Sequence, residues 1–124
     1  MKAMKKPMLN SNFSVDRHCL IRKGQEGWMQ GSDCIRVRFT DATVYPEFVS
    51  YYLLTDAVKM KINNSAVGST MASMNIDILG DIDIILPDYE EQKRVALILG
   101  TIDKKISNNN QINDYLAYHS LMVA

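Results

Sequence analysis

Two groups of side chains have the right types for catalysis or metal binding. His18 with Cys19 offers a base beside a nucleophile, and Asp77, Asp81 and Asp83 offer carboxylates. Neighbouring residues of a strand point to opposite faces, so His18 is poorly placed to activate Cys19. Asp81 and Asp83 would share one strand face and suit a divalent cation, but no further ligand stands at a helpful spacing. Independent catalysis is therefore the weaker alternative.

The other metal-ligand types give no better site. Cys19 and Cys34 are far apart in the chain, no CxxC motif is present, and no histidine cluster accompanies them. Because this spacing does not suit zinc, we expect buried thiols. His18 and His119 each stand alone. The sequence predicts neither a metal nor a cofactor on this chain.

Basic side chains are concentrated in the first third of the chain. Residues 1–40 carry eight Lys or Arg and three Asp or Glu, whereas the whole chain has zero net charge. The first segment is therefore positive by five charges and the remainder negative by five. This asymmetry indicates a polyanionic partner for the first segment, although a solvated surface explains it equally well.

Some of these basic residues fall on short extended segments. Residues 33–39 alternate, with apolar side chains on one face and Arg36 and Arg38 on the other, which predicts a half-buried strand. A strand is also expected at residues 18–22, and the glycine-bounded residues 23–27 should form the turn that follows it.

Short helices should follow this extended part. Pro46 suits the first turn of a helix, because its missing N–H needs no partner there. Thr55 or Asp56 should cap a second short helix that ends near residues 63–65. After a polar loop, residues 75–80 should form one helical turn closed by glycine.

A further strand and a long helix complete the chain. Residues 81–86 alternate, which predicts a strand with Ile82, Ile84 and Leu86 inward. Pro87 should end this strand, and Asp88 should cap the helix that begins there, with Glu91 three residues later as its capping-box partner. Glu90 and Glu91 also place negative charge at the positive end of the helix dipole.

The long helix carries an apolar seam. Its members recur at alternating spacings of four and three residues, as in a coiled coil interrupted by two asparagines: Val95, Leu99, Ile102, Ile106, Asn109, Asn113 and Leu116. Gly100 indicates a close helix approach or simple tolerance of a poor helix former. The Asn run at 108–110 is an alternative, earlier end of the helix.

Helix length predicts a partner. A helix from residue 88 to about residue 121 is roughly 50 Å long, whereas a globule of 87 residues is about 30 Å across. The seam would therefore project into water unless a second helix covers it, and the asparagines would then fix register and orientation. We expect an α+β fold: a small mixed domain with short strands and helices over residues 1–87, then a long coiled-coil-forming helix over 88–124.

The chain length and the first residues suggest an intracellular protein. At 124 residues and 47% hydrophobic, the chain suits one modest core. It has neither a run of about 18 apolar residues nor an apolar segment behind the lysines at its start. We expect a cytoplasmic protein.

Taken together, these segments resemble the specificity subunits of type I restriction-modification systems. The junction Leu86-Pro87 followed by Glu90-Glu91-Gln92-Lys93-Arg94-Val95 is similar to the one between a target recognition domain and its conserved helix. Upstream segments agree: residues 31–38, Pro46-Glu47-Phe48 with residues 51–54, and residues 68–70 with Asn75. The likeness covers roughly residues 17–116. Thirty residues precede Gly31, fewer than in that family, so we expect an incomplete recognition domain.

This resemblance implies a non-catalytic subunit that reads double-stranded DNA. In the family, two recognition domains each read half of a bipartite site, and two conserved helices pair antiparallel between them. The helices dock methyltransferase subunits, which bind S-adenosylmethionine, and an ATP-driven restriction subunit completes the complex. With one recognition-like segment and one helix, this chain resembles half of such a subunit, and two copies would restore the symmetry.

The resemblance also implies roles for particular residues. Candidate DNA contacts are Arg22, Lys23, Gln25, Arg36, Arg38, Ser69 and Thr70, with cations for phosphates and Gln25 or an arginine for base edges. Candidate helix-interface residues are Leu99, Ile102, Ile106, Asn109, Asn113 and Leu116. Candidate docking residues for the methyltransferase are Glu90, Glu91, Lys93 and Arg94. The alternatives are solvated strand and helix faces, a structural turn at residues 68–70, packing of the first half of the helix on its own domain, and an interaction module that does not read DNA.

Overall fold

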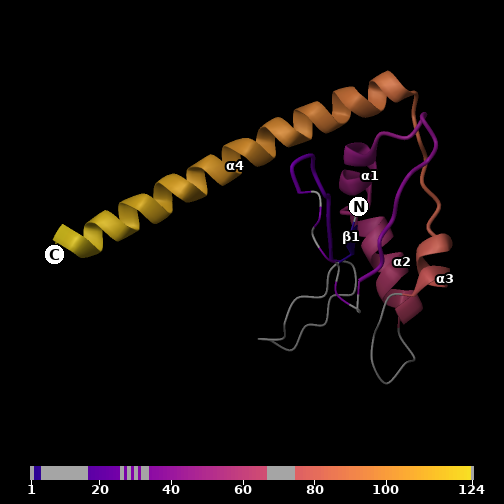
Figure 1. The fold of residues 1–124 in the computed structure, drawn as a ribbon, viewed down its shortest axis with the longest axis horizontal. Helices are drawn as coiled ribbons and strands as arrows, with labels where there is room; N and C mark the ends of the chain where they lie inside the picture. Colours follow the sequence, from indigo (N-terminus) through magenta and orange to yellow (C-terminus); the bar gives the residue numbers. More distant parts are fainter. Residues whose placement is uncertain are drawn as a thin grey trace.

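The computed structural model describes residues 2–3, 17–25, 27, 29, 31, 34–66 and 75–123 of the chain. Its elements are β1 (Lys2–Ala3), β2 (His18–Cys19), α1 (Pro46–Tyr52), α2 (Asp56–Ala66), α3 (Ile76–Gly80) and α4 (Tyr89–Val123). The first five elements gather at one end of α4, and the rest of α4 extends away from them as a rod (Figure 1). The expected α+β fold, a small mixed domain followed by a long helix, is confirmed.

The core lies between the two helices that precede α3. Val49 and Leu53 project from α1 and its last turn, Val58 and Ile62 project from α2, and all four are buried. Each pair is separated by four residues, so it lies on one helix face. Pro46 occupies the first turn of α1, as the sequence predicted. Half-buried side chains close the cluster from outside: Phe39, Val44, Tyr52, Ile82 and Ile84.

Two of the three predicted strands do not form a ladder in the described residues. Residues 34–39 carry only an isolated bridge at Arg36, although their burial alternates as expected, with Arg36 and Arg38 exposed. Residues 81–86 are irregular; Ile82 and Ile84 face the core, but Leu86 is 39% exposed, so its inward placement was wrong. A two-residue period reports one buried face and does not reveal whether a neighbouring strand exists to pair with it.

The third predicted strand is shorter than expected. Of residues 18–22, only His18–Cys19 forms a strand, β2, which pairs antiparallel with β1. Lys2 lies opposite Cys19, and Ala3 lies opposite His18. The first residues of the chain therefore supply the partner strand that periodicity alone did not identify.

Side-chain caps begin the last two helices. The Asn75 carboxamide accepts a hydrogen bond from the Ile78 N–H at 2.8 Å, which starts α3. The Asp88 carboxylate accepts from the Glu91 N–H at 2.9 Å, which confirms it as the cap of α4. The Glu91 carboxylate pairs with Arg94 at 2.8 Å.

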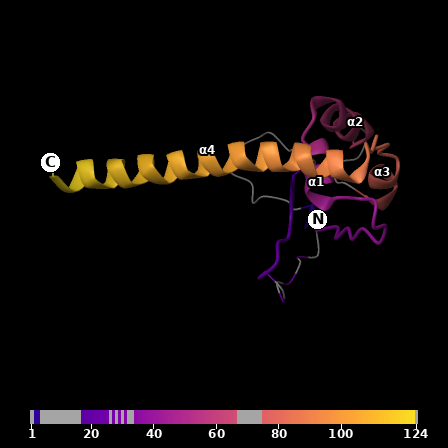
Figure 2. The ribbon, with the colours of Figure 1, turned by 90° about the horizontal axis from the view of Figure 1, so that it is seen from above.

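The long helix continues well beyond the globular part. α4 has 35 residues and does not end at the Asn run, which lies inside it. Seen from above, it is straight and projects from one side of the globular part (Figure 2). At 1.5 Å per residue it is about 52 Å long, close to the predicted length. Within the described residues, no helix combines the length and apolar character needed to cross a membrane.

Candidate nucleic-acid interface and helix junction

A tight turn presents the first pair of candidate DNA contacts. The Gln25 N–H donates to the Arg22 carbonyl at 3.2 Å, and the Arg22 N–H donates to the Gln25 side-chain oxygen at 2.8 Å. Gly24 adopts a φ of +92° within this turn, a value that favours glycine. Arg22 and Lys23 are exposed. The turn therefore fixes the backbone at two cationic residues, Arg22 and Lys23. Its hydrogen bond uses the side-chain oxygen of Gln25, and the side-chain nitrogen remains a donor.

The second pair of cations lies on the extended segment that leads to α1. Arg36 and Arg38 are both exposed, whereas Ile35, Val37 and Phe39 between and beside them are half-buried. The alternation holds the two guanidinium groups on the outer face, where phosphates can reach them. Ser69 and Thr70, the other candidate contacts, lie outside the described residues.

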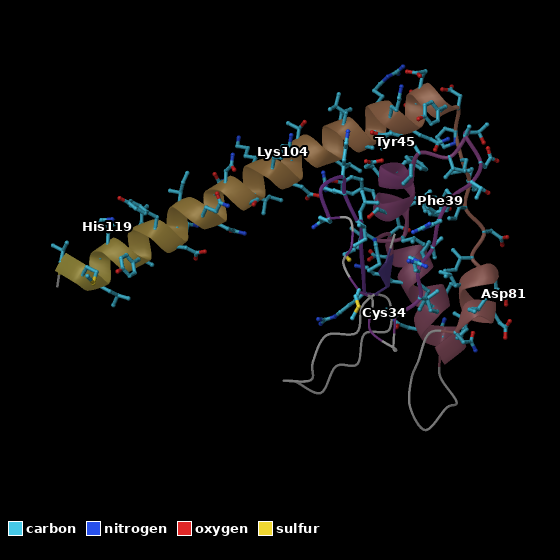
Figure 3. The ribbon with its side chains drawn as sticks, viewed as in Figure 1. Cys34, Phe39, Tyr45, Asp81, Lys104 and His119 are labelled. Carbon is cyan, nitrogen blue, oxygen red and sulfur yellow. The ribbon has the colours of Figure 1, made fainter. Side chains whose placement is uncertain are left out.

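A buried glutamine joins the globular part to α4. Gln92 is 1% exposed, and its side chain makes three hydrogen bonds. Its oxygen accepts from the Tyr45 N–H at 2.9 Å, and its nitrogen donates to the Thr43 and Pro87 carbonyls at 2.9 and 2.8 Å. Tyr45 lies below the first turns of α4 (Figure 3). One side chain thus satisfies three backbone groups from both sides of the junction.

Sequence reasoning had not assigned Gln92 any role. Its position carries a signal all the same, because it precedes Val95 by three residues and so extends the seam spacing toward the start of the helix. A polar residue at an apolar seam position indicates a buried hydrogen-bonding role. Ala96, the other buried residue of α4, lies one turn further along.

A second contact holds α4 about three turns after Gln92. The Tyr51 hydroxyl of α1 donates to the Asp103 carboxylate at 2.6 Å. Desolvation, followed by the hydrogen bond to Asp103, raises the pKa of Tyr51 from 10.0 to about 12, and the positive charge of Arg22 opposes the shift. A Cβ at Gly100 would lie 3.7 Å from the Tyr51 hydroxyl, an ordinary van der Waals contact, so the packing of α1 against α4 does not require glycine at this position. Because the positive charge of Arg22 acts on Tyr51, Arg22 lies near this junction.

The charged first turn of α4 is paired within itself. Lys93 lies 3.2 Å from Glu90, and Arg94 lies 2.8 Å from Glu91. The Lys93 ammonium also lies 5.0 Å from the centre of the Tyr89 ring. The Glu90 partnership raises the pKa of Lys93. Such exposed pairs contribute little to stability. The docking of a methyltransferase at this turn stays a prediction.

The seam divides at the end of the globular part. Val95 and Leu99 are half-buried, whereas Ile102, Ile106 and Leu116 are 51%, 53% and 58% exposed. Every residue from Thr101 to Val123 is exposed. Lys104 lies where the rod leaves the globular part, and His119 lies near its far end (Figure 3). Packing on the chain's own domain therefore accounts for the first turns of the seam and leaves the rest uncovered.

The candidate catalytic groups have structural contacts in the described residues. His18 Nε2 donates to the Ser50 carbonyl at 2.9 Å, which links β2 to α1. Lys61 donates to the Asp81 carbonyl and lies 3.4 Å from the Asp83 carboxylate. Cys19 and Cys34 are both half-buried. Within the described parts of the chain, no three His, Cys, Asp or Glu residues gather where a metal ion could bind.

The fold and the site together define a class of protein: a small unit with outward cations, anchored to a rod whose far half is exposed in the described part of the chain. The particular family follows from comparison. The family model of the type I restriction modification DNA specificity domain matches residues 18–118, and the chain belongs to that family. The match includes both the globular part and most of α4. No solved structure matches the chain.

Proposed function

We propose that this protein is a non-catalytic specificity component that reads part of a bipartite DNA target in a type I restriction-modification complex. The family match, which spans the cationic globular part and the helix together, carries this proposal. Arg22, Lys23, Arg36 and Arg38 would neutralise phosphates, and the Gln25 amide or an arginine would read base edges.

The partners would bind along α4. A second copy would cover the exposed seam beyond Asp103, and the charged first turn, Glu90 to Arg94, would dock a methyltransferase subunit. S-adenosylmethionine and ATP would bind the methyltransferase and restriction subunits, and the complex would act in the cytoplasm. The extent of exposed apolar surface on residues 104–123 supports a partner, because monomeric proteins rarely expose contiguous apolar surface of this kind.

The salt dependence of DNA binding tests the reading role. If Arg36 and Arg38 each neutralise one phosphate, replacing both by alanine should weaken binding to duplex DNA and reduce the log–log salt slope by about 2. Fluorescence anisotropy at several salt concentrations measures this slope, with the cognate methyltransferase present. The matched control replaces Lys104 and Lys105 by alanine, which removes the same charge from the rod.

Two results would decide against DNA reading. Equal losses in the two double variants would show a general charge effect rather than contact by the arginines. No salt-sensitive binding by the unaltered protein, together with a clear dimer in sedimentation, would favour the second candidate function, an interaction module that works through α4 alone. The exposed seam is the observation that supports this second candidate.

A further inference from the structure

Two hydrogen bonds attach α1 to α4, one at each end of α1. At the start of α1, the Gln92 side chain of α4 accepts from the Tyr45 N–H at 2.9 Å. In the last turn of α1, the Tyr51 hydroxyl donates to the Asp103 carboxylate at 2.6 Å. The two attachments are about 16 Å apart along the axis of α4. A single attachment would allow α1 to pivot about it, whereas two attachments fix the orientation of α1 relative to α4.

The same helix also holds the strand that leads to the candidate DNA-contact turn. His18 Nε2 in β2 donates to the Ser50 carbonyl at 2.9 Å and lies 3.2 Å from the Ser50 hydroxyl. β2 is two residues long and pairs with a strand of equal length, so this ladder alone constrains it weakly. Ser50 and Tyr51 are neighbours in α1. The bond from β2 and the bond from α4 therefore meet on adjacent residues of one helix.

The turn that carries Arg22, Lys23 and Gln25 follows β2 directly in the chain. Its backbone is fixed internally, because the Arg22 N–H donates to the Gln25 side-chain oxygen at 2.8 Å. Its placement relative to α4 depends instead on what holds β2, and the His18 bond ties β2 to α1. The positive charge of Arg22 acts on the Tyr51 phenol, so the turn also lies near the second attachment of α1.

We propose that His18 and Tyr51 are positioning residues for DNA reading, which together hold this turn in one orientation relative to α4. The role rests on the proposed function, in which the turn contacts DNA and α4 binds the partners. A chain of bonds connects the two sites, from Asp103 to Tyr51 in α1 and from the preceding residue of α1 to His18. Loss of either bond leaves the internal geometry of the turn intact but widens the range of positions that the turn samples. Its cations then bind phosphates less well, because more conformational freedom is lost on binding.

Another candidate DNA contact provides an internal control. Arg36 lies on the extended segment that leads to α1. This segment is bonded to Gln92 through the Thr43 carbonyl and the Tyr45 N–H. It is therefore held by the first attachment of α1, at the opposite end from Tyr51. A change at Tyr51 should disturb the turn and leave Arg36 in place.

Spin-label distances test the positioning role without DNA. Labels are attached through cysteines introduced in the full-length protein, whose native cysteines are replaced by serine: Lys23→Cys in the turn and Lys104→Cys in α4. The labelled protein is mixed with an excess of unlabelled protein, so that only distances within one chain are measured. Double electron–electron resonance should give one narrow distance. Tyr51→Phe and His18→Ala should each broaden it, and His18→Gln, which keeps a donor of similar reach, should restore it.

The matched control places the first label at Arg36→Cys instead of Lys23→Cys. The distance from this label to residue 104 should stay narrow in the Tyr51→Phe protein. Equal broadening for both label pairs would show a general loosening of the globular part and would overturn the proposal. Unchanged distributions for the Lys23→Cys pair would overturn it as well.

A double-mutant cycle tests the effect on DNA binding, with the cognate methyltransferase present. Tyr51→Phe should weaken binding to duplex DNA about fivefold, an effect of the size of one hydrogen bond. In a protein that already carries Arg22→Ala and Lys23→Ala, the same change should have little further effect, because the cations that it displaces are absent. In the Arg36→Ala protein the full effect should remain.

The outcomes of this cycle separate the positioning role from the proposed function. Equal losses in both backgrounds would show that Tyr51 acts on the stability of the whole fold, and the positioning role would be refuted. The same holds for unchanged affinity in the Tyr51→Phe protein. No salt-sensitive binding by the unaltered protein would refute the proposed function and with it any role in DNA reading. Unchanged spin-label distances in a protein that does bind DNA would refute the positioning role alone.

Discussion

The two halves of α4 have different environments although they form one uninterrupted helix. Residues 89–103 complete the globular part through buried Gln92 and Ala96 and the bond from Tyr51 to Asp103. Residues 104–123 are exposed throughout, yet they include large apolar side chains such as Ile106, Ile112 and Leu116. The first half therefore belongs to the fold of one chain, and the second half is the part available for association. Substitutions in the two halves should affect different equilibria.

The largest effect is expected in the far half of the helix. Ile106→Lys should weaken dimerisation by about 3 kcal/mol or more, roughly a hundredfold in Kd, because each dimer contains the change twice. The thermal stability of the dilute monomer should stay unchanged. Sedimentation velocity over a concentration series measures the fractions of monomer and dimer, and a thermal melt of the dilute protein measures the stability of the monomer. Leu97→Lys, at a position 71% exposed on another face, is the matched control; an equal loss in that variant would contradict a specific seam.

The next effect belongs to the near half. Gln92→Ala should lower the free energy of unfolding by about 3 kcal/mol, because the Tyr45 N–H and the Thr43 and Pro87 carbonyls lose their buried partner. Urea denaturation at one fixed protein concentration measures the change. Gln111→Ala removes an exposed glutamine from the same helix and should change stability by less than about 0.5 kcal/mol. Equal effects would refute the structural role of Gln92.

The same two halves show how far sequence reasoning extends. Regular patterns predicted the helices: Pro46 and Asp88 mark true starts, and the expected helix from residue 88 to about residue 121 agrees with α4, which ends at Val123. The exposed seam was also predictable, because helix length exceeded the size of the domain. The irregular backbone at residues 81–86, where a strand was expected, could not be predicted from the sequence. Alternation of apolar and polar residues cannot show that a neighbouring strand is missing.

Contacts between distant segments were likewise hidden. One partner of Gln92 is the backbone N–H of a residue 47 positions earlier, and the partner of Asp103 is a tyrosine hydroxyl 52 positions earlier. Neither pair leaves a periodic signal, since each depends on how α1 crosses α4. Of the candidate DNA contacts, the sequence predicted an exposed outer face for Arg36 and Arg38, and the structure places both on it. Their contact with DNA stays a prediction.

A smaller effect is expected where the two halves meet. Tyr51→Phe removes the hydroxyl that holds Asp103 and should cost about 1 kcal/mol, reduced by the partial exposure of the pair. The raised pKa of Tyr51 means that the folded state favours the protonated phenol. Its contribution is therefore complete below pH 10 and is lost as the pH rises toward 12.

Denaturant melts of both proteins across that pH range measure the difference. The unaltered protein should lose its advantage over the Phe variant between pH 10 and pH 12. A constant difference across the range would show that the hydroxyl contributes by packing alone. Tyr118→Phe, an exposed tyrosine in the far half, should show no such difference from the unaltered protein at any pH.

The smallest effect on stability comes from the charged first turn, and this makes it the clearest site for testing docking. Arg94→Ala breaks an exposed pair with Glu91, so the free energy of unfolding should change by about 0.3 kcal/mol. If Arg94 contacts the methyltransferase, its removal should nevertheless weaken that complex by tenfold or more, about 1.4 kcal/mol. Calorimetric titration with the cognate subunit separates the two effects, and Lys104→Ala provides a charge-matched control. Unchanged affinity in the Arg94 variant would leave this turn with capping and solvation as its only roles.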